Sequence, residues 1–277
     1  MLNWFPGHMN SARRDIHKAM PNTDLVIEML DARIPFSSEN PLVTKLRGDR
    51  PCIQILNKAD LADPDVTAEW LARIETREGV LAMTHEQNQS RLNQRLLQRV
   101  RALVPTKGAR PVAAMIMGIP NVGKSTLINA LSGRAIAKTG NKPAITRHQQ
   151  RVKIGKDLVL WDTPGFLWPR LSPKACGYRL AVTGAISDRV VDAQDIAQFA
   201  VDFLVERYPE RLLEKYGLTE LPQGELAVLE AIGRRRGFLR KGGVVDLERA
   251  ANALLNDLNA GTLGRISLET PADCFRS

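Results

Sequence analysis

A glycine-rich loop at residues 118–125 limits the possible folds of this 277-residue chain more than any other feature. It reads Gly-Ile-Pro-Asn-Val-Gly-Lys-Ser, which fits the pattern G-x-x-x-x-G-K-[ST]. An apolar stretch at 112–117 precedes it, and a segment with helical spacing at 124–132 follows it. Glycines let backbone N–H groups surround a phosphate, and a helix N-terminus adds positive potential. The sequence therefore predicts a nucleotide-binding α/β domain, although the loop alone does not distinguish GTP from ATP.

The residues of this loop have different expected roles. Lys124 is expected to contact the β- and γ-phosphates and to act in catalysis, and the Ser125 hydroxyl is expected to ligate Mg²⁺. The other residues of the segment that are expected to bind the nucleotide are Asn121, Val122, Gly123 and Thr126.

A second motif, Asn57-Lys58-Ala59-Asp60, follows an apolar strand candidate at 52–56 and predicts recognition of guanine. The Asp60 carboxylate can accept hydrogen bonds from the ring N1–H and the exocyclic amine of guanine, whereas adenine has no donor at ring N1. An unpaired buried acceptor costs about 1–3 kcal/mol, which is enough for discrimination. Lys58 would lie over the base, and Asn57 would connect this motif to the phosphate loop. Taken alone, such a match can also be an ordinary strand-end turn.

A third motif, Asp162-Thr163-Pro164-Gly165, follows a strand candidate at 158–161. Asp162 would hold Mg²⁺ through water, and the Gly165 amide would sense the γ-phosphate. Thr146 lies between the phosphate loop and this motif, where it would close on Mg²⁺ and act in catalysis when GTP is bound. The alternative for Thr146 is a turn or capping residue.

The order of the motifs predicts a circular permutation, because in Ras-like proteins the base-recognition motif comes last. We therefore expect a circularly permuted Ras-like P-loop GTPase domain with a mostly parallel six-stranded sheet over residues 1–172. A three-residue connection, Gly-Lys-Asp at 155–157, predicts a hairpin and one antiparallel strand. The predicted strands are 25–30, 52–56, 80–83, 112–117, 149–154 and 158–161, and the helices before residue 172 are 10–20, 39–47, 65–77, 90–103 and 124–132.

Residues 173–277 are expected to form an all-α C-terminal domain, with helices at 195–207, 222–233 and 246–258. Because this domain directly follows the motif that ends at Gly165, hydrolysis could reorient it. The charge also differs between the two parts: residues 1–174 hold 26 Lys/Arg and 15 Asp/Glu, whereas residues 175–277 hold 13 and 15. Positions 87–156 contain 14 basic residues and no acidic one. The positive field of such a segment attracts polyanions. The alternative is that these residues form a solvated surface.

Motifs at distant positions resemble the ribosome biogenesis GTPase A group of circularly permuted GTPases. They include, besides the three motifs above, Trp-Phe-Pro-Gly-His-Met at 4–9, Asp-Ala-Arg-Ile-Pro at 31–35, Lys-Gly-Gly at 241–243 and Leu-Gly-Arg-Ile-Ser-Leu-Glu at 263–269. The resemblance implies a GTPase that acts on the large ribosomal subunit precursor and contacts rRNA through its helical domain. One departure lies in the second base loop, where the chain has Met-Thr-His at 83–85 and we assign Thr84 to the nucleotide.

Catalysis has to proceed without the glutamine that Ras-like enzymes carry, because Phe166 follows Gly165. The resemblance implies that His8, near the N-terminus, orients the attacking water, since neutral imidazole can accept a proton near pH 7. The alternatives are slow intrinsic hydrolysis and a surface or packing role for His8. It also implies that Asn121 ligates a K⁺ ion beside the phosphates; the alternative for Asn121 is a loop-shaping role.

Five cations lie close together in the otherwise acidic C-terminal part and are expected to contact RNA phosphates. They are Arg234, Arg235, Arg236, Arg240 and Lys241. The alternative is a solvated helix end. For the neighbouring Phe238 we expect a place in the core rather than on RNA.

Two other functions remain as alternatives to a GTPase of large-subunit assembly: a nucleotide-gated RNA-binding scaffold with negligible turnover, and a GTPase acting on another RNA. A permuted GTPase of the small-subunit type would need a barrel domain before the base motif and a zinc site, but only 56 residues and three scattered cysteines are present. No apolar run reaches the length of a membrane span and the N-terminus lacks a signal-peptide pattern, so we expect a cytoplasmic protein without membrane contact. We also expect the protein to be a monomer.

Overall fold

The computed structural model describes residues 8–86, 91–105, 110–134, 150–169, 171–186 and 192–275, with only the backbone described for 8–13 and 150. The chain divides into two compact units. The first, here called the GTPase unit after the domain predicted above, consists of Met1–Leu171 with Glu269–Ser277, and the second, the helical unit, consists of Ser172–Leu268.

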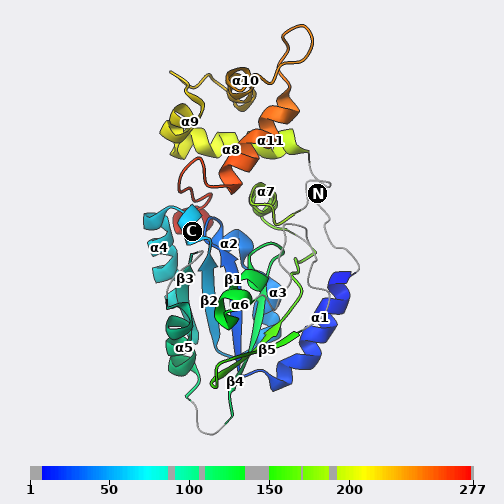
Figure 1. The fold of residues 1–277 in the computed structure, drawn as a ribbon, viewed down its shortest axis with the longest axis vertical. Helices are drawn as coiled ribbons and strands as arrows, with labels where there is room; N and C mark the ends of the chain where they lie inside the picture. The colour runs from blue at the N-terminus through cyan, green and yellow to red at the C-terminus, as the bar shows by residue number, and fades with distance from the viewer. Residues whose placement is uncertain are drawn as a thin grey trace. The chain divides into compact units, whose positions relative to one another are not determined.

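A six-stranded sheet with the order β3-β2-β1-β4-β6-β5 forms the centre of the GTPase unit (Figure 1). All pairings are parallel except that of β5 with β6, so the predicted mostly parallel sheet and its hairpin are confirmed. The strands are β1 (Leu25–Asp31), β2 (Cys52–Asn57), β3 (Val80–His85), β4 (Val112–Gly118), β5 (Gln150–Ile154) and β6 (Leu158–Asp162). β1 and β2 are buried along their whole length, as expected for strands covered on both faces.

Helices cover both faces of this sheet. Figure 1 shows α4 and α5 along one side and α1 and α3 along the other. Local sequence determines where they begin: the side chain of Asn40 accepts a hydrogen bond from the Leu42 N–H at the start of α3, and Asp63 accepts from Asp65 N and Val66 N at the start of α4. The helices are α1 (His8–Ala19), α2 (Pro35–Ser38), α3 (Pro41–Arg47), α4 (Pro64–Glu75), α5 (Leu92–Leu103), α6 (Lys124–Ser132) and α12 (Pro271–Cys274).

The helical unit packs its helices around small and branched apolar side chains. Ala197, Ala200 and Leu204 of α8 are fully buried, as are Leu229 of α10 and Leu254 of α11. Two short helices, α7 and α9, lie where the sequence predicted none, and an isolated antiparallel bridge joins Leu239 and Val245. The helices are α7 (Lys174–Val182), α8 (Ala193–Arg207), α9 (Pro209–Tyr216), α10 (Glu225–Arg235) and α11 (Leu247–Asn259).

The C-terminal segment corrects the predicted boundary of 173–277, because its described residues from 269 onward belong to the GTPase unit. The buried Glu269 carboxylate accepts hydrogen bonds from the backbone N–H of Ser37 at 2.9 Å and from its hydroxyl at 2.5 Å. The indole N–H of Trp70 donates to the Glu269 carbonyl at 3.2 Å, and the Phe275 ring packs edge-on against Phe36. These contacts place the C-terminal segment in the unit in which the chain begins, and residue spacing in the sequence cannot predict them.

Over the described ranges given above, no helix is both long and apolar enough to cross a bilayer.

Candidate nucleotide-binding site

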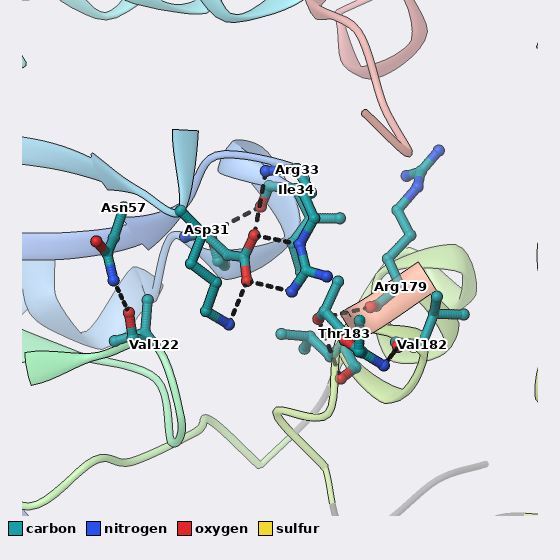
Figure 2. Close-up of polar contacts among 12 residues, drawn as sticks. Asp31, Arg33, Ile34, Asn57, Val122, Arg179, Val182 and Thr183 are labelled. Carbon is teal, nitrogen blue, oxygen red and sulfur yellow. Dashed lines mark hydrogen bonds and ion pairs between the residues drawn. The ribbon is translucent and has the colours of Figure 1, made fainter. Parts of the chain in front are cut away.

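Three parallel strands end in register at one edge of the sheet, and this register brings the base motif to the phosphate loop. Asp31 of β1 lies opposite Asn57 of β2, which in turn lies opposite His85 of β3. The Asn57 carboxamide Nδ2 donates to the carbonyl oxygen of Val122 at 2.6 Å (Figure 2). The ligand-binding edge of a parallel sheet is the one at the carboxyl ends of its strands.

Gly123 makes this contact between the two motifs possible. A Cβ atom at this position would lie 2.3 Å from Asn57 Nδ2, and the residue has φ +100°, which side chains rarely adopt. The second glycine of the G-x-x-x-x-G-K-[ST] pattern is therefore required both by the backbone and by the close approach of the base motif.

Two buried charged side chains, Asp31 and Arg33, lie beside the partly exposed Lys58 of the base motif. Its ammonium group donates to Asp31 Oδ2 at 2.9 Å, and the Arg33 guanidinium contacts both oxygens of the same carboxylate, with Nε at 2.9 Å and Nη2 at 2.8 Å (Figure 2 shows the pair of Asp31 and Arg33). Burial alone would raise the pKa of Asp31, but the charges and hydrogen bonds of Arg33 and Lys58 outweigh it and lower this pKa below its ordinary value. Asp31 thus stays ionised and fixes the base-motif lysine.

Lys124 and Asp162 form the charged centre of the phosphate-binding region. Lys124 Nζ donates to the carbonyls of Gly118 at 3.1 Å and Ile119 at 2.8 Å. Burial lowers the pKa of Lys124 to about 8, although the charge of Asp162 opposes the shift. Burial also raises the pKa of Asp162 to about 6, against the effect of Lys124. Both Asp162 carboxylate oxygens are buried, and neither has a hydrogen-bond partner within the described ranges.

The segment after Asp162 is held against β4 and the phosphate loop. The Thr163 hydroxyl donates to the Ile116 carbonyl at 2.7 Å, and a Cβ atom on Gly165 would lie 2.8 Å from both Lys124 Nζ and Pro120 Cα. The Phe166 ring is buried. The backbone carbonyl of Phe166 accepts a hydrogen bond from Asn40 Nδ2 at 2.9 Å. Gly165 therefore lies beside the lysine that is expected to contact the γ-phosphate.

The structure also places the other predicted residues, or leaves them outside its description. Asp60 is exposed, Ser125 and Thr126 lie in the first turn of α6, and Asn121 has φ +56°. Thr84 is half-buried within β3. Thr146 lies outside the described residues, and for His8 only the backbone is described, as the first residue of α1.

Two polar side chains that we did not select from the sequence, Asp31 and His85, contact the base motif directly. The His85 ring Nδ1 lies 2.6 Å from Asn57 Oδ1. The signal for both was their position at the ends of strands adjacent to β2, where parallel strands place side chains beside a ligand loop.

In the helical unit, three of the five clustered cations are engaged in ion pairs. Arg236 pairs with Asp257 at 2.8 Å, Arg240 with Asp246 at 3.0 Å, and Arg234 with Glu230 at 4.0 Å. For the exposed Arg235 and Lys241, no ion-pair partner occurs among the residues the structure describes.

Phe238 is a correction to the expected core position. It is only half-buried, and the guanidinium of Arg249 lies over its ring, with the Cζ atom 4.7 Å from the ring centroid.

Comparison with known proteins agrees with this geometry. Residues 113–221 match the family described as 50S ribosome-binding GTPase, a match that starts in β4 and leaves the base motif at 57–60 before it, as a permuted order requires. The chain is 44% identical over 280 residues to ribosome biogenesis GTPase A of Bacillus pumilus, covering 98% of this chain and 99% of the relative. The chain belongs to the ribosome biogenesis GTPase A family.

More distant relatives are also similar over both units. Mitochondrial ribosome-associated GTPase 1 of Mus musculus is 31% identical over 295 residues, covering 97% of this chain and 90% of the relative. The solved structure of GNP-bound YlqF from T. maritima is 28% identical with a TM-score of 0.68, covering 95% of this chain and 99% of that chain. The predicted fold, a circularly permuted GTPase domain with a helical C-terminal part, is thereby confirmed, and the protein is a GTP hydrolase.

Proposed function

We propose that this GTPase is a switch in assembly of the large ribosomal subunit, and that it acts in the cytoplasm as a monomer that contacts rRNA through its helical unit and its basic surface. The observation that carries the proposal is that the likeness to proteins named for ribosome biogenesis covers 98% of this chain, and so extends over the helical unit as well as the nucleotide site. Arg235 and Lys241 are the residues in the helical unit that we propose for phosphate contact, because they are exposed and not engaged in the ion pairs described above.

The nucleotide site has the donors that a magnesium ion requires. The buried carboxylate of Asp162 lacks a hydrogen-bond partner within the described ranges, and Ser125 supplies a hydroxyl in the first turn of α6. These hard oxygen donors fit Mg²⁺, which binds through one or two protein oxygens together with phosphates and water. We propose that Thr146 joins them when GTP is bound. The ion, when bound, neutralises charge on the β- and γ-phosphates.

The residues of this chain position the nucleotide for attack by water. Lys124 exchanges its two contacts to loop carbonyls for phosphate oxygens, Asp60 accepts from the guanine edge, and the Gly165 amide meets the γ-phosphate. Asn121 is proposed as a ligand of K⁺, a cation that would provide part of the charge of an arginine finger.

GTP turnover should rise when large ribosomal subunits are added and stay at its basal rate with small subunits. A charge supplied by a partner accelerates other GTPases by about 10³–10⁵-fold, so we expect stimulation of at least on the order of tenfold. The measurement is phosphate release in K⁺ buffer, repeated in Na⁺ buffer, where the rate should fall if Asn121 ligates K⁺.

The alternatives have distinct results in the same assay. No stimulation by any RNA would support the nucleotide-gated scaffold, and stimulation by an unrelated RNA would support a GTPase of another RNA. In the double variant R235E/K241E, stimulation by large subunits should be reduced while basal turnover and GDP affinity, which depend on the other unit, remain unchanged.

His8→Ala should lower turnover and leave GTP affinity intact, because the proposed imidazole orients water and does not hold the nucleotide. General acid–base groups contribute about 10²–10⁴-fold to rate, so the fall should be easily measured in single-turnover hydrolysis beside equilibrium binding of a GTP analogue. His17→Ala, at the other end of α1, is the matched control. Unchanged turnover in His8→Ala would exclude the role.

A further inference from the structure

The last residue of β3, His85, is a buried polar group that the mechanism above does not use. It is 4% exposed, lies opposite Asn57 in the parallel register, and places ring Nδ1 2.6 Å from Asn57 Oδ1. The other end of the same carboxamide contacts the phosphate loop at Val122. The Asn57 side chain therefore joins the base motif to the phosphate loop, and His85 of β3 contacts the same carboxamide.

Hydrogen-bond chemistry fixes the roles of all three groups. The Val122 carbonyl can only accept, so Asn57 must turn its NH₂ group toward it, and its oxygen therefore faces the His85 ring. Two acceptors would not approach to 2.6 Å, so His85 Nδ1 must carry a proton and donate it.

The proton on Nδ1 belongs to a neutral ring. Burial lowers the pKa of His85, with the nearby Arg95 adding to the shift and Asp60 and Glu86 opposing it. The ring thus has Nδ1–H as its donor and leaves Nε2 unprotonated.

We propose that His85 is a positioning residue for guanine nucleotides: by donating to Asn57 Oδ1, it holds the carboxamide in the orientation that connects the base motif to the phosphate loop. The two ligand-binding segments are then ordered before the nucleotide arrives, which lowers the ordering cost of binding. The proposal relies on residues 57–60 being the base motif, and not on any action at the ribosome.

A pair of substitutions separates hydrogen bonding from packing. In asparagine the amide nitrogen is separated from Cβ by one atom, as Nδ1 is in histidine, so His85→Asn retains a donor in the same place. His85→Leu keeps a bulky side chain and removes the donor, which leaves Asn57 Oδ1 buried and unpaired. The Kd for GDP and for a non-hydrolysable GTP analogue should rise by about tenfold to a hundredfold in His85→Leu and stay within about threefold in His85→Asn.

Two further measurements make the result specific. IDP lacks the exocyclic amine that Asp60 recognises, so the ratio of IDP to GDP affinity should be the same in His85→Leu as in the wild type, because base reading itself is untouched. In an Asn57→Ala background, His85→Leu should add almost nothing, as required for a residue that acts through Asn57. His17→Leu, the same substitution at an exposed histidine of α1, is the control and should bind GDP as the wild type does.

Several results would overturn the assignment: wild-type GDP affinity in His85→Leu, equal losses in His85→Asn and His85→Leu, or full additivity with Asn57→Ala. Each would leave the GTPase assignment in place, because stimulation by large ribosomal subunits is measured separately in the unsubstituted protein.

Discussion

Asp31→Asn is expected to lower the free energy of unfolding of the GTPase unit by about 3–5 kcal/mol, because it removes the negative charge that two cations contact inside the protein. The side chains of Asp31 and Arg33 are each 2% exposed, and that of Lys58 is 25% exposed. Asparagine keeps one acceptor oxygen for Arg33 but supplies no charge. The loss of a partner from a buried ion pair costs far more than the pair contributes, since the remaining ions stay desolvated.

Urea unfolding followed by circular dichroism measures this change, and Asp157→Asn is the matched control. Asp157 also pairs with an arginine, Arg101, at 3.1 Å, but the two side chains are 52% and 61% exposed. Exposed pairs contribute about 0–1 kcal/mol, so the control should be nearly neutral. Equal effects of the two substitutions would show that the Asp31 cluster is not desolvated in solution. Asp31→Asn should also weaken GDP binding, because Lys58 loses the contact that fixes it.

The sequence was sufficient to predict the frame of the GTPase unit. Alternating apolar runs and turn residues located all six strands, and the extent of β4 and α6 followed from the phosphate loop between them. These features are local: a strand covered on both faces is apolar along its length, and glycine is needed where the backbone turns positive in φ. The motif order fixed the permutation without any knowledge of contacts.

Contacts between residues distant in sequence could not be predicted in this way. The return of Glu269 to Ser37 depends on a carboxylate meeting a helix N-terminus 232 positions earlier, and no periodicity records it. The partners of Asn57 are similar: in the sequence His85 is only part of the departure at 83–85 in the second base loop, whereas the strand register makes it the neighbour of the base motif. Only the pairing of β2 with β3 reveals that role.

Gly165→Ala is expected to reduce GTP turnover by about a hundredfold, the cost of a displacement near 1 Å in a reacting site. A Cβ atom would lie 2.8 Å from Pro120 Cα and 2.9 Å from Pro120 N, and these backbone atoms cannot move aside as a flexible side chain would. It would also crowd Lys124 Nζ at 2.8 Å. The amide that meets the γ-phosphate must therefore shift away from the phosphate loop. GDP affinity should change less, since GDP has no γ-phosphate.

Gly133→Ala separates this crowding from a general effect of losing a glycine. Gly133 follows α6 with φ +66° and has no atom within 4 Å of the added Cβ, so alanine there costs about 1 kcal/mol of stability through the backbone alone and should leave turnover unchanged. Single-turnover hydrolysis and GDP binding, measured for Gly165→Ala and Gly133→Ala, distinguish crowding of the site from the general loss of a glycine. Wild-type turnover in Gly165→Ala would mean that this segment leaves the phosphate loop during catalysis. In that case the contact from Asn40 to the Phe166 carbonyl would also break, and the γ-phosphate signal would have to reach the helical unit by another segment.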